Sequence, residues 1–300
     1  MKHLKILSPF IFSLLFFITS CNTDDTSIPE GKGKLNVYIT DAPFPIDLIN
    51  STSVNINKIE IRYKAELDAE SEQDSFIVIS DEEMEIDLLD LTNGITELMA
   101  SIDLEPGYYD MIRLHVGDAV VVMNDESVFD LKIPSGYSSG LKIKIKPAIY
   151  LTEGQTSDVL LDFDVSKSFV AKGNIKNLKG FNFKPVVRAV YISAAGRIEG
   201  DVTNENEEPL ENAYVKILLP DDYEWNEDSA DSIEDNCIAS FSDINGEFKI
   251  IGLPIGDYTV VCELEGYTND TIENVTVKAG ESTKINFQMI EEPLVELPAN

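Results

Sequence analysis

Short runs in which apolar and polar residues alternate recur along most of this chain. In one of the first, Leu35, Val37 and Ile39 would face one way and the residues between them the other. A period of two residues is typical of a β-strand with one buried face, and no helical period extends beyond about two turns. The chain is therefore predicted to be all-β, built from antiparallel β-sandwiches. Because a domain holds roughly 100–200 residues, the 300-residue chain should contain two such domains in tandem.

The expected segments follow one another without overlap. They are a signal peptide (1–20), a flexible tether (21–32), a first β-sandwich (33–193), a second β-sandwich (194–291) and a tail (292–300). Within the first sandwich the apolar phase slips from even to odd positions near Asn57 and Lys58, which predicts a β-bulge there.

The N-terminal segment has the layout of a secretory signal. Two lysines precede a nine-residue apolar run, Phe10 to Ile18, which is too short for a membrane-spanning helix of about 20 residues. The run ends in Ile18-Thr19-Ser20-Cys21, which resembles the bacterial lipobox. That resemblance implies cleavage before Cys21, a lipid on this cysteine and anchoring by two or three acyl chains. The alternative is an ordinary cleavable signal that contains a cysteine by chance.

Charge narrows the classes of partner. The chain holds 54 acidic and 23 basic residues, a formal net charge of −31 at pH 7. Binding of nucleic acid or of anionic lipid headgroups needs basic patches, so the balance argues against both.

Six ordered motifs in the first predicted sandwich resemble an uncharacterised family, domain of unknown function 4382. They are Leu35-x-Val37-x-Ile39-Thr40-Asp41-Ala42-Pro43, Asp90-Leu91-Thr92-Asn93-Gly94, Pro106-Gly107-x-Tyr109-x-x-Ile112-Arg113-Leu114, Pro134-Ser135-Gly136-x-x-Ser139-Gly140-Leu141-Lys142, Leu161-Asp162-Phe163-Asp164 and Lys184-Pro185-Val186-Val187-Arg188. The resemblance implies a bacterial surface lipoprotein with no established reaction. Together with the lipobox it predicts a lipid-anchored protein of the bacterial outer membrane, exposed at the cell surface.

The second predicted sandwich resembles the carboxypeptidase regulatory-like domain. The motifs are Ser242-Asp243-x-Asn245-Gly246-x-Phe248, Leu253-Pro254-x-Gly256-x-Tyr258-x-Val260 and Gly266-Tyr267. The resemblance implies a small prealbumin-like sandwich, grouped with carbohydrate-binding-like folds. It implies no peptidase activity, because the name refers to an accessory domain.

Three aspartates of the first sandwich are a candidate metal site. Asp162 and Asp164 alternate on one strand, and Asp41 would join them if the first strand lies beside it. Ca²⁺ prefers about six to eight oxygen ligands, so a carboxylate cluster could hold it. The alternative is a solvated face with a local pair between aspartate and Lys167. The sequence calls for no other cofactor.

Lysines occupy alternate positions of another strand. Lys142, Lys144 and Lys146 lie opposite the apolar face formed by Leu141, Ile143 and Ile145. We expect them to solvate the strand or to protect a sheet edge. The alternative is docking against an acidic partner.

An acidic insertion interrupts the second sandwich between 220 and 236. It contains Tyr223 and the single tryptophan, Trp225. These aromatic side chains could stack on a sugar ring, with carboxylates bonding hydroxyl groups or Ca²⁺. The alternative is a solvated loop with no ligand.

Two cysteines follow Cys21. Cys262 shares a strand face with apolar residues, so it should point inward. We favour two separate buried thiols for Cys237 and Cys262 over a disulfide, which an oxidising compartment would permit.

The sequence marks no catalytic site. One histidine, His115, remains after the signal, and nucleophile-elbow, zinc and phosphate-loop motifs are absent. We therefore predict a protein that is not an enzyme, a structural or interaction module with a glycan or another surface protein as partner. The alternative function is glycan binding by the second sandwich.

Overall fold

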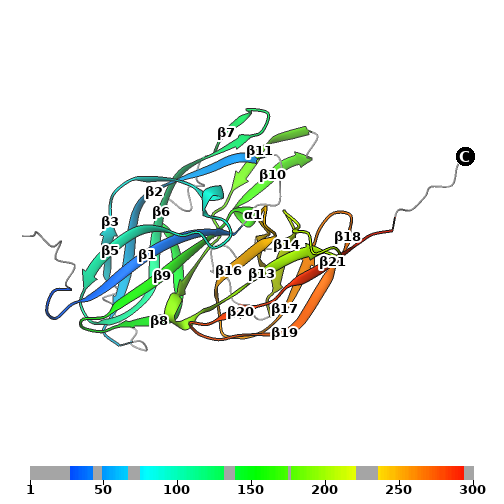
Figure 1. Ribbon diagram of the computed structural model, residues 1–300. Helices are drawn as coiled ribbons and strands as arrows, with labels where there is room; N and C mark the ends of the chain where they lie inside the picture. The colour runs from blue at the N-terminus through cyan, green and yellow to red at the C-terminus, as the bar shows by residue number, and fades with distance from the viewer. Residues whose placement is uncertain are drawn as a thin grey trace, which may run out of the picture.

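The computed structural model describes residues 28–42, 49–66, 75–131, 139–174, 177–220 and 236–293 (Figure 1). Strands account for most of these residues, and they form two domains in tandem, each around its own core. The predicted all-β fold with two sandwich domains is confirmed. Among the described residues, no helix has the length and apolar character needed to span a membrane.

The first domain is built from twelve strands and two helical turns. They are β1 (Gly33–Ala42), β2 (Ile49–Lys64), β3 (Ser75–Ser80), β4 (Met84–Asp87), the 3-10 turn η1 (Leu88–Leu91), β5 (Glu97–Leu104), β6 (Gly107–Met123), β7 (Val128–Leu131), β8 (Leu141–Leu151), β9 (Thr156–Asp164), α1 (Val165–Ser168), β10 (Phe169–Asn174), β11 (Asn177–Phe183) and β12 (Val187–Tyr191).

Eight of these strands form one continuous sheet in the order β3-β2-β6-β8-β12-β9-β1-β5. Strands β4 and β7 add to β2 and β6, and β10 pairs with β11 as a separate hairpin. The end strands β3 and β5 also contact each other, so the sheet curls around a single core. Two neighbouring pairs, β1 with β9 and β8 with β12, are parallel, which alternation alone does not reveal.

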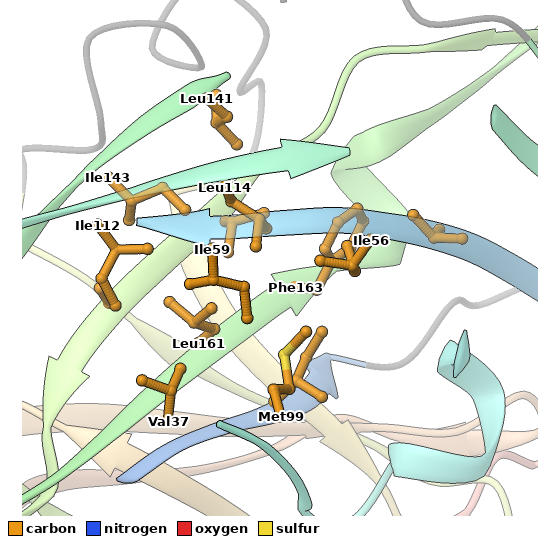
Figure 2. Close-up of a cluster of buried hydrophobic side chains, with 14 of the residues drawn as sticks. Val37, Ile56, Ile59, Met99, Ile112, Leu114, Leu141, Ile143, Leu161 and Phe163 are labelled. Carbon is orange, nitrogen blue, oxygen red and sulfur yellow. The ribbon is translucent and has the colours of Figure 1, made fainter. Parts of the chain in front are cut away.

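The core of the first domain is aliphatic, with a few aromatic rings (Figure 2). Val37, Ile59 and Leu161 are fully buried in it, and Phe163 packs among them. Each such side chain contributes about 1.5–3 kcal/mol by leaving water. The alternation read in the sequence therefore assigns the correct residues to the inside.

One local expectation concerns the bulge in β2. The pairing of β2 with β6 shifts register between Ile56 and Lys58, so the predicted β-bulge is confirmed. A 3-10 turn at Leu88–Leu91 precedes β5. Asp87 caps that turn by accepting a hydrogen bond from the Leu89 N–H at 3.1 Å.

The second domain follows after the short turn η3 (Ile192–Ala194). Its strands are β13 (Gly196–Asn204), β14 (Tyr214–Leu218), β15 (Cys237–Phe241), β16 (Glu247–Leu253), β17 (Gly256–Glu263), β18 (Tyr267–Thr268), β19 (Asp270–Val277), β20 (Ser282–Lys284) and β21 (Phe287–Glu291). One sheet has the order β16-β13-β21-β18 with β20 beside β13, and the other has the order β15-β14-β17-β19. Since β12 lies in the first domain's sheet and β13 in the second's, the junction falls between Tyr191 and Gly196.

Candidate functional site at the domain junction

The sheet of the first domain places an acid and a base side by side at its outer surface. Strand β9 pairs antiparallel with β12, and Asp162 lies opposite Arg188 in the register. The Arg188 Nε donates to Asp162 Oδ2 at 2.6 Å, and the two side chains also meet through Nη2. Asp162 and Arg188 are 6% and 7% exposed, so this is a buried ion pair.

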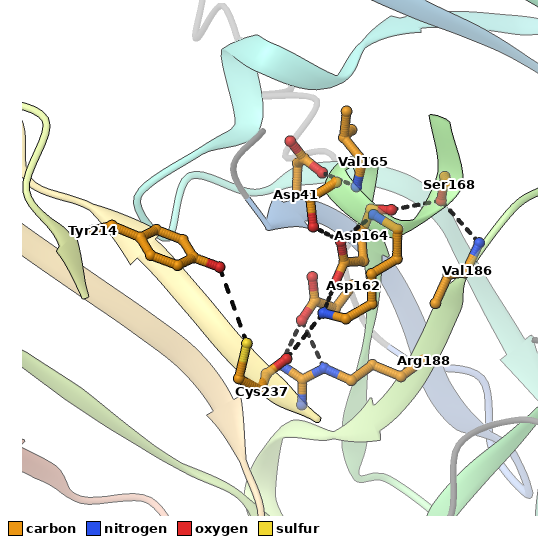
Figure 3. A network of polar contacts seen from close by, with 11 residues as sticks. Asp41, Asp162, Asp164, Val165, Ser168, Val186, Arg188, Tyr214 and Cys237 are labelled. Carbon is orange, nitrogen blue, oxygen red and sulfur yellow. Dashed lines mark hydrogen bonds and ion pairs between the residues drawn. The ribbon is translucent and has the colours of Figure 1, made fainter. Parts of the chain in front are cut away.

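Arg188 also reaches the second domain. Its Nη1 donates to the carbonyl oxygen of Gly252 at 2.6 Å, and its Nη2 donates to that of Ile251 at 3.2 Å. The planar guanidinium thus bonds a carboxylate on one side and backbone carbonyls on the other. Figure 3 shows Arg188 beside Asp162.

A second ion pair of the first domain also reaches the second domain. Asp164 caps α1, because its Oδ1 accepts the Lys167 N–H at 2.9 Å. The Lys167 Nζ donates to Asp164 Oδ2 at 2.5 Å and to the carbonyl oxygen of Cys237 at 2.9 Å. The aspartate–Lys167 pair predicted as an alternative is confirmed. The solvated face that we expected with it is wrong, since the second domain covers it and Asp164 is 6% exposed.

Asp41 does come close to the other two aspartates, because β1 lies beside β9 (Figure 3). Its Oδ1 accepts a hydrogen bond from the Val165 N–H at 3.2 Å. In the described part of the chain, however, no group of three or more His, Cys, Asp or Glu residues is placed so that it could hold a metal ion. Cations of the chain pair with Asp162 and Asp164 instead, so the structure favours ion pairs over the calcium site.

Burial dominates the electrostatics of this network. Removal from water raises the pKa of the Asp162 carboxyl, while the charge of Arg188 opposes that rise. A buried pair of this kind costs desolvation of both ions and becomes favourable only when the remaining hydrogen-bonding groups are satisfied. The carbonyls of the second domain supply acceptors for Arg188, so the pair depends on the domains staying together.

Backbone contacts complete the junction. Gly252 has φ +68°, and a Cβ there would lie 3.0 Å from Leu160 Cδ2. In the loop before β5, Asn93 Nδ2 donates to the Glu247 carbonyl at 3.2 Å. Gly94 has φ +74°, which favours glycine, and a Cβ there would lie 2.7 Å from Lys249 Cδ and would displace that side chain.

A cleft of about 820 Å³ opens beside these contacts. Most of its lining comes from β13, β16 and the β20–β21 connection of the second domain, with the loop before β5 on the other side. The polar residues in its lining are Asn93, Glu199, Asp201, Glu247, Lys249, Lys284 and Asn286. The cleft therefore offers donors and acceptors of both signs to a polar ligand.

The other predicted residues divide into three groups. Cys21, Tyr223 and Trp225 lie outside the described residues, so these predictions stand as they were made. Cys237 and Cys262 are free and buried, which confirms two separate thiols. The lysines of β8 face outward as expected, but β8 lies between β6 and β12, so they do not protect an edge.

No role was predicted for Arg188, although it lies in the last of the six motifs of the first domain. The available signal was an arginine inside the apolar strand Val187–Tyr191. Arginine is rarely buried without a partner, so that context predicts a buried carboxylate nearby.

Two β-sandwiches define a tandem all-β protein, and two paired cations of the first domain bond backbone carbonyls of the second. The chain belongs to the family described as Domain of unknown function (DUF4382), whose model matches residues 32–185. The model of the carboxypeptidase regulatory-like domain matches residues 197–290. Neither is a catalytic family. Comparison with curated proteins gives no match.

Solved structures resemble the chain only distantly. Catechol 1,2 dioxygenase from Acinetobacter radioresistens shares 12% identity at a TM-score of 0.27, over 36% of this chain and 57% of that one. GBS52, the minor pilin of Streptococcus agalactiae, shares 11% identity at a TM-score of 0.26, over 88% of this chain and 99% of the pilin. The shaft pilin spaA of Lactobacillus rhamnosus GG shares 13% identity at a TM-score of 0.26, over 88% of this chain and 100% of the pilin. The chain spans 57–61% of the length of the dioxygenases that it matches, and these likenesses carry no argument about activity.

Proposed function

We propose that this chain is a non-catalytic surface lipoprotein, held on the bacterial outer membrane by lipid on Cys21, whose two sandwiches act as one structural or interaction unit. The observation that carries the proposal is the contact of Arg188 with both Asp162 and Gly252. The most deeply buried charges at the junction hold the domains together instead of facing a substrate. This use of charge suits a spacer or scaffold that must keep a fixed shape outside the membrane.

The anchor rests on the lipobox-like Ile18-Thr19-Ser20-Cys21. Its test is metabolic labelling with a radioactive fatty acid, followed by membrane fractionation and protease treatment of intact cells. We expect Cys21→Ala to lose the label and leave the membrane fraction, while Cys237→Ala keeps both. Labelling that survives Cys21→Ala would contradict the anchor, and resistance of the anchored protein to added protease would contradict surface exposure.

A second candidate function is glycan binding by the second domain. The cleft of about 820 Å³ supports it, because second-domain residues such as Asp201 and Asn286 contribute hydrogen-bonding groups to its lining. A glycan array is the test, with Trp225→Ala probing the acidic insertion and Asp201→Ala probing the cleft. Binding that either substitution abolishes would locate the site, whereas an array without signal would reject this candidate.

A further inference from the structure

The outer face of the first domain carries a concentration of positive charge, although the chain as a whole is acidic. We name it the cationic face and define it by seven side chains on three adjacent strands. They are Lys58, Arg62 and Lys64 on β2, Arg113 on β6, and Lys142, Lys144 and Lys146 on β8. The same strands hold only three carboxylates, Glu60, Asp110 and Asp118. A positive excess therefore stands out against the net charge of −31.

Strand pairing brings these side chains together. In the register Arg113 lies opposite Glu60 on β2 and opposite Lys142 on β8. Neighbouring strands are about 4.8 Å apart, and alternate residues along a strand are about 6.7 Å apart. The cations thus form a grid of neighbouring charges on the sheet, not isolated surface charges.

Buried acids hold part of the grid in position. Glu60 is 7% exposed, and its carboxylate contacts Lys58 Nζ at 3.2 Å, Arg113 Nη1 at 3.3 Å and His115 Nε2 at 2.7 Å. The Arg113 guanidinium also lies 3.5 Å from the centre of the Phe76 ring. Glu60 therefore orients three basic side chains, but its single negative charge cannot neutralise both Lys58 and Arg113, so the group keeps a net positive charge.

A similar arrangement occurs toward the end of β2. Asp110 accepts two hydrogen bonds from Arg62, each 2.7 Å long, and lies 3.4 Å from Lys64 Nζ. The bidentate contact fixes the guanidinium plane. These cations are placed by the fold before any partner arrives, which lowers the entropy cost of binding.

An aromatic pair borders the same face. Tyr108 and Tyr150 are register partners on β6 and β8, with ring centres 4.7 Å apart. Tyr150 is 55% exposed, so much of its side chain is open to a ligand. Exposed aromatic rings provide platforms on which sugar rings stack.

The second domain leaves this face open. Val190 lies opposite Lys146 in the register, and it is buried beside Gly252 of the second domain. The junction therefore ends at the row of lysines on β8. All three lysines remain exposed there.

We propose that the cationic face binds an anionic polysaccharide. Repeated carboxylates along such a polymer match the repeated cations. The tyrosine pair favours a polysaccharide over an acidic polypeptide, because only the polysaccharide has sugar rings that can stack on the tyrosines. A polysaccharide with one charge per sugar ring has a lower charge density than nucleic acid. The net charge of −31 on the protein therefore repels such a polysaccharide less than it repels nucleic acid. The inference shares only the partner class with the second candidate function, and it does not depend on the lipid anchor.

The test uses the full chain purified in detergent and polygalacturonate as the probe. The uncharged control is the fully methyl-esterified polymer, which keeps the same backbone. One variant combines Lys142→Gln, Lys144→Gln and Lys146→Gln, and the matched control combines Lys172→Gln, Lys179→Gln and Lys278→Gln, three exposed lysines elsewhere. Both variants lose the same charge, and circular dichroism checks that both are folded.

We expect wild type to bind polygalacturonate, binding to weaken as salt rises, and the β8 variant to bind about tenfold less tightly or worse. The matched control should bind like wild type, and Tyr150→Ala should weaken binding without lowering the melting temperature.

Five outcomes would overturn the proposal, and the first four concern the polymers and the two triple variants. They are equal binding of the esterified polymer, equal losses in the two triple variants, tighter binding of polyglutamate than of polygalacturonate, and no binding at all. Loss of binding in Trp225→Ala with none in the β8 variant would also reject it, while leaving the second candidate function standing.

Discussion

The guanidinium of Arg188 donates a hydrogen bond from Nη1 to the carbonyl oxygen of Gly252 at 2.6 Å, across the boundary between the two domains. The same guanidinium holds Asp162 through its Nε at 2.6 Å. One side chain therefore serves a buried carboxylate in the first domain and the backbone of the second. Separating the domains would break the bonds from Arg188 to the second domain and expose its ion pair with Asp162 to water, so the junction is linked to the pairing of β9 with β12.

Replacing Arg188 with methionine should destabilise the chain strongly. The substitution keeps an unbranched apolar stem but leaves Asp162 without its cation, and removal of one partner of a buried ion pair costs about 3–5 kcal/mol. Urea unfolding should show the loss, and limited proteolysis should cut faster near 192–195. The control is Arg197→Met, whose side chain is 47% exposed and 3.4 Å from Glu199, and which should cost less than about 1 kcal/mol. Equal losses in the two variants would contradict the role assigned to Arg188.

Gly252→Ala should disturb the junction through its Cβ. At φ +68° a non-glycine residue costs about 1–2 kcal/mol, and the added carbon would also lie 3.0 Å from Leu160 Cδ2. Gly280→Ala is the matched control, because Gly280 has φ +69° with no atom within 4 Å of its Cβ position. The difference between the two free energies of unfolding therefore measures the interdomain contact. If both variants lose the same stability, Gly252 matters only for its backbone conformation.

Glu60 should make the first domain sensitive to acid. Burial raises the pKa of its carboxyl, but hydrogen bonds from His115 and Lys58 outweigh this and leave the pKa below its usual value. An acid with a lowered folded pKa stabilises the fold above its unfolded pKa, about 4.3, and that contribution is lost as pH falls through the folded value. Urea unfolding between pH 7 and pH 3 should thus show a loss of stability that is smaller in Glu60→Gln.

At neutral pH Glu60→Gln should cost about 1–3 kcal/mol, because Arg113 and Lys58 lose a charged partner. Glu292→Gln, an exposed change directly after β21, should leave the whole pH profile as in wild type. A Glu60→Gln profile parallel to that of wild type would show that this carboxylate carries none of the acid sensitivity.

The two thiols of the second domain should be inert in the folded protein. Burial raises the pKa of Cys262 to about 12, with the nearby charges of Asp270 and Glu263 adding to it, so the reactive thiolate is scarce. In a Cys21→Ala background, a thiol reagent such as DTNB should label neither cysteine in native buffer and both in urea. Dithiothreitol should not change the melting temperature. A lower melting temperature on reduction would mean that a disulfide exists after all.

Local pattern predicted much of what is buried, and it failed where partners come from distant segments. Alternation correctly assigned Val37 and Ile143 to the core and Lys142 to the outside. The same pattern placed Asp162 and Asp164 on an outward face, which is correct for the isolated sheet. The pattern could not show that the second domain covers that face, because contact with another domain does not change the alternation of polar and apolar residues along the strand.

The sequence by itself determined the all-β class and the bulge in β2, since both depend on side-chain alternation, and the chain length indicated two domains. Whether Cys237 and Cys262 pair depends on the distance between them, so only the tertiary structure decided that they are separate thiols. Only the tertiary structure decided that β1 runs parallel to β9, that Arg188 crosses to Gly252, and that three strands assemble one cationic face. The physical reason is that alternation assigns a side chain to a face, whereas the neighbour on that face depends on strand order and domain packing.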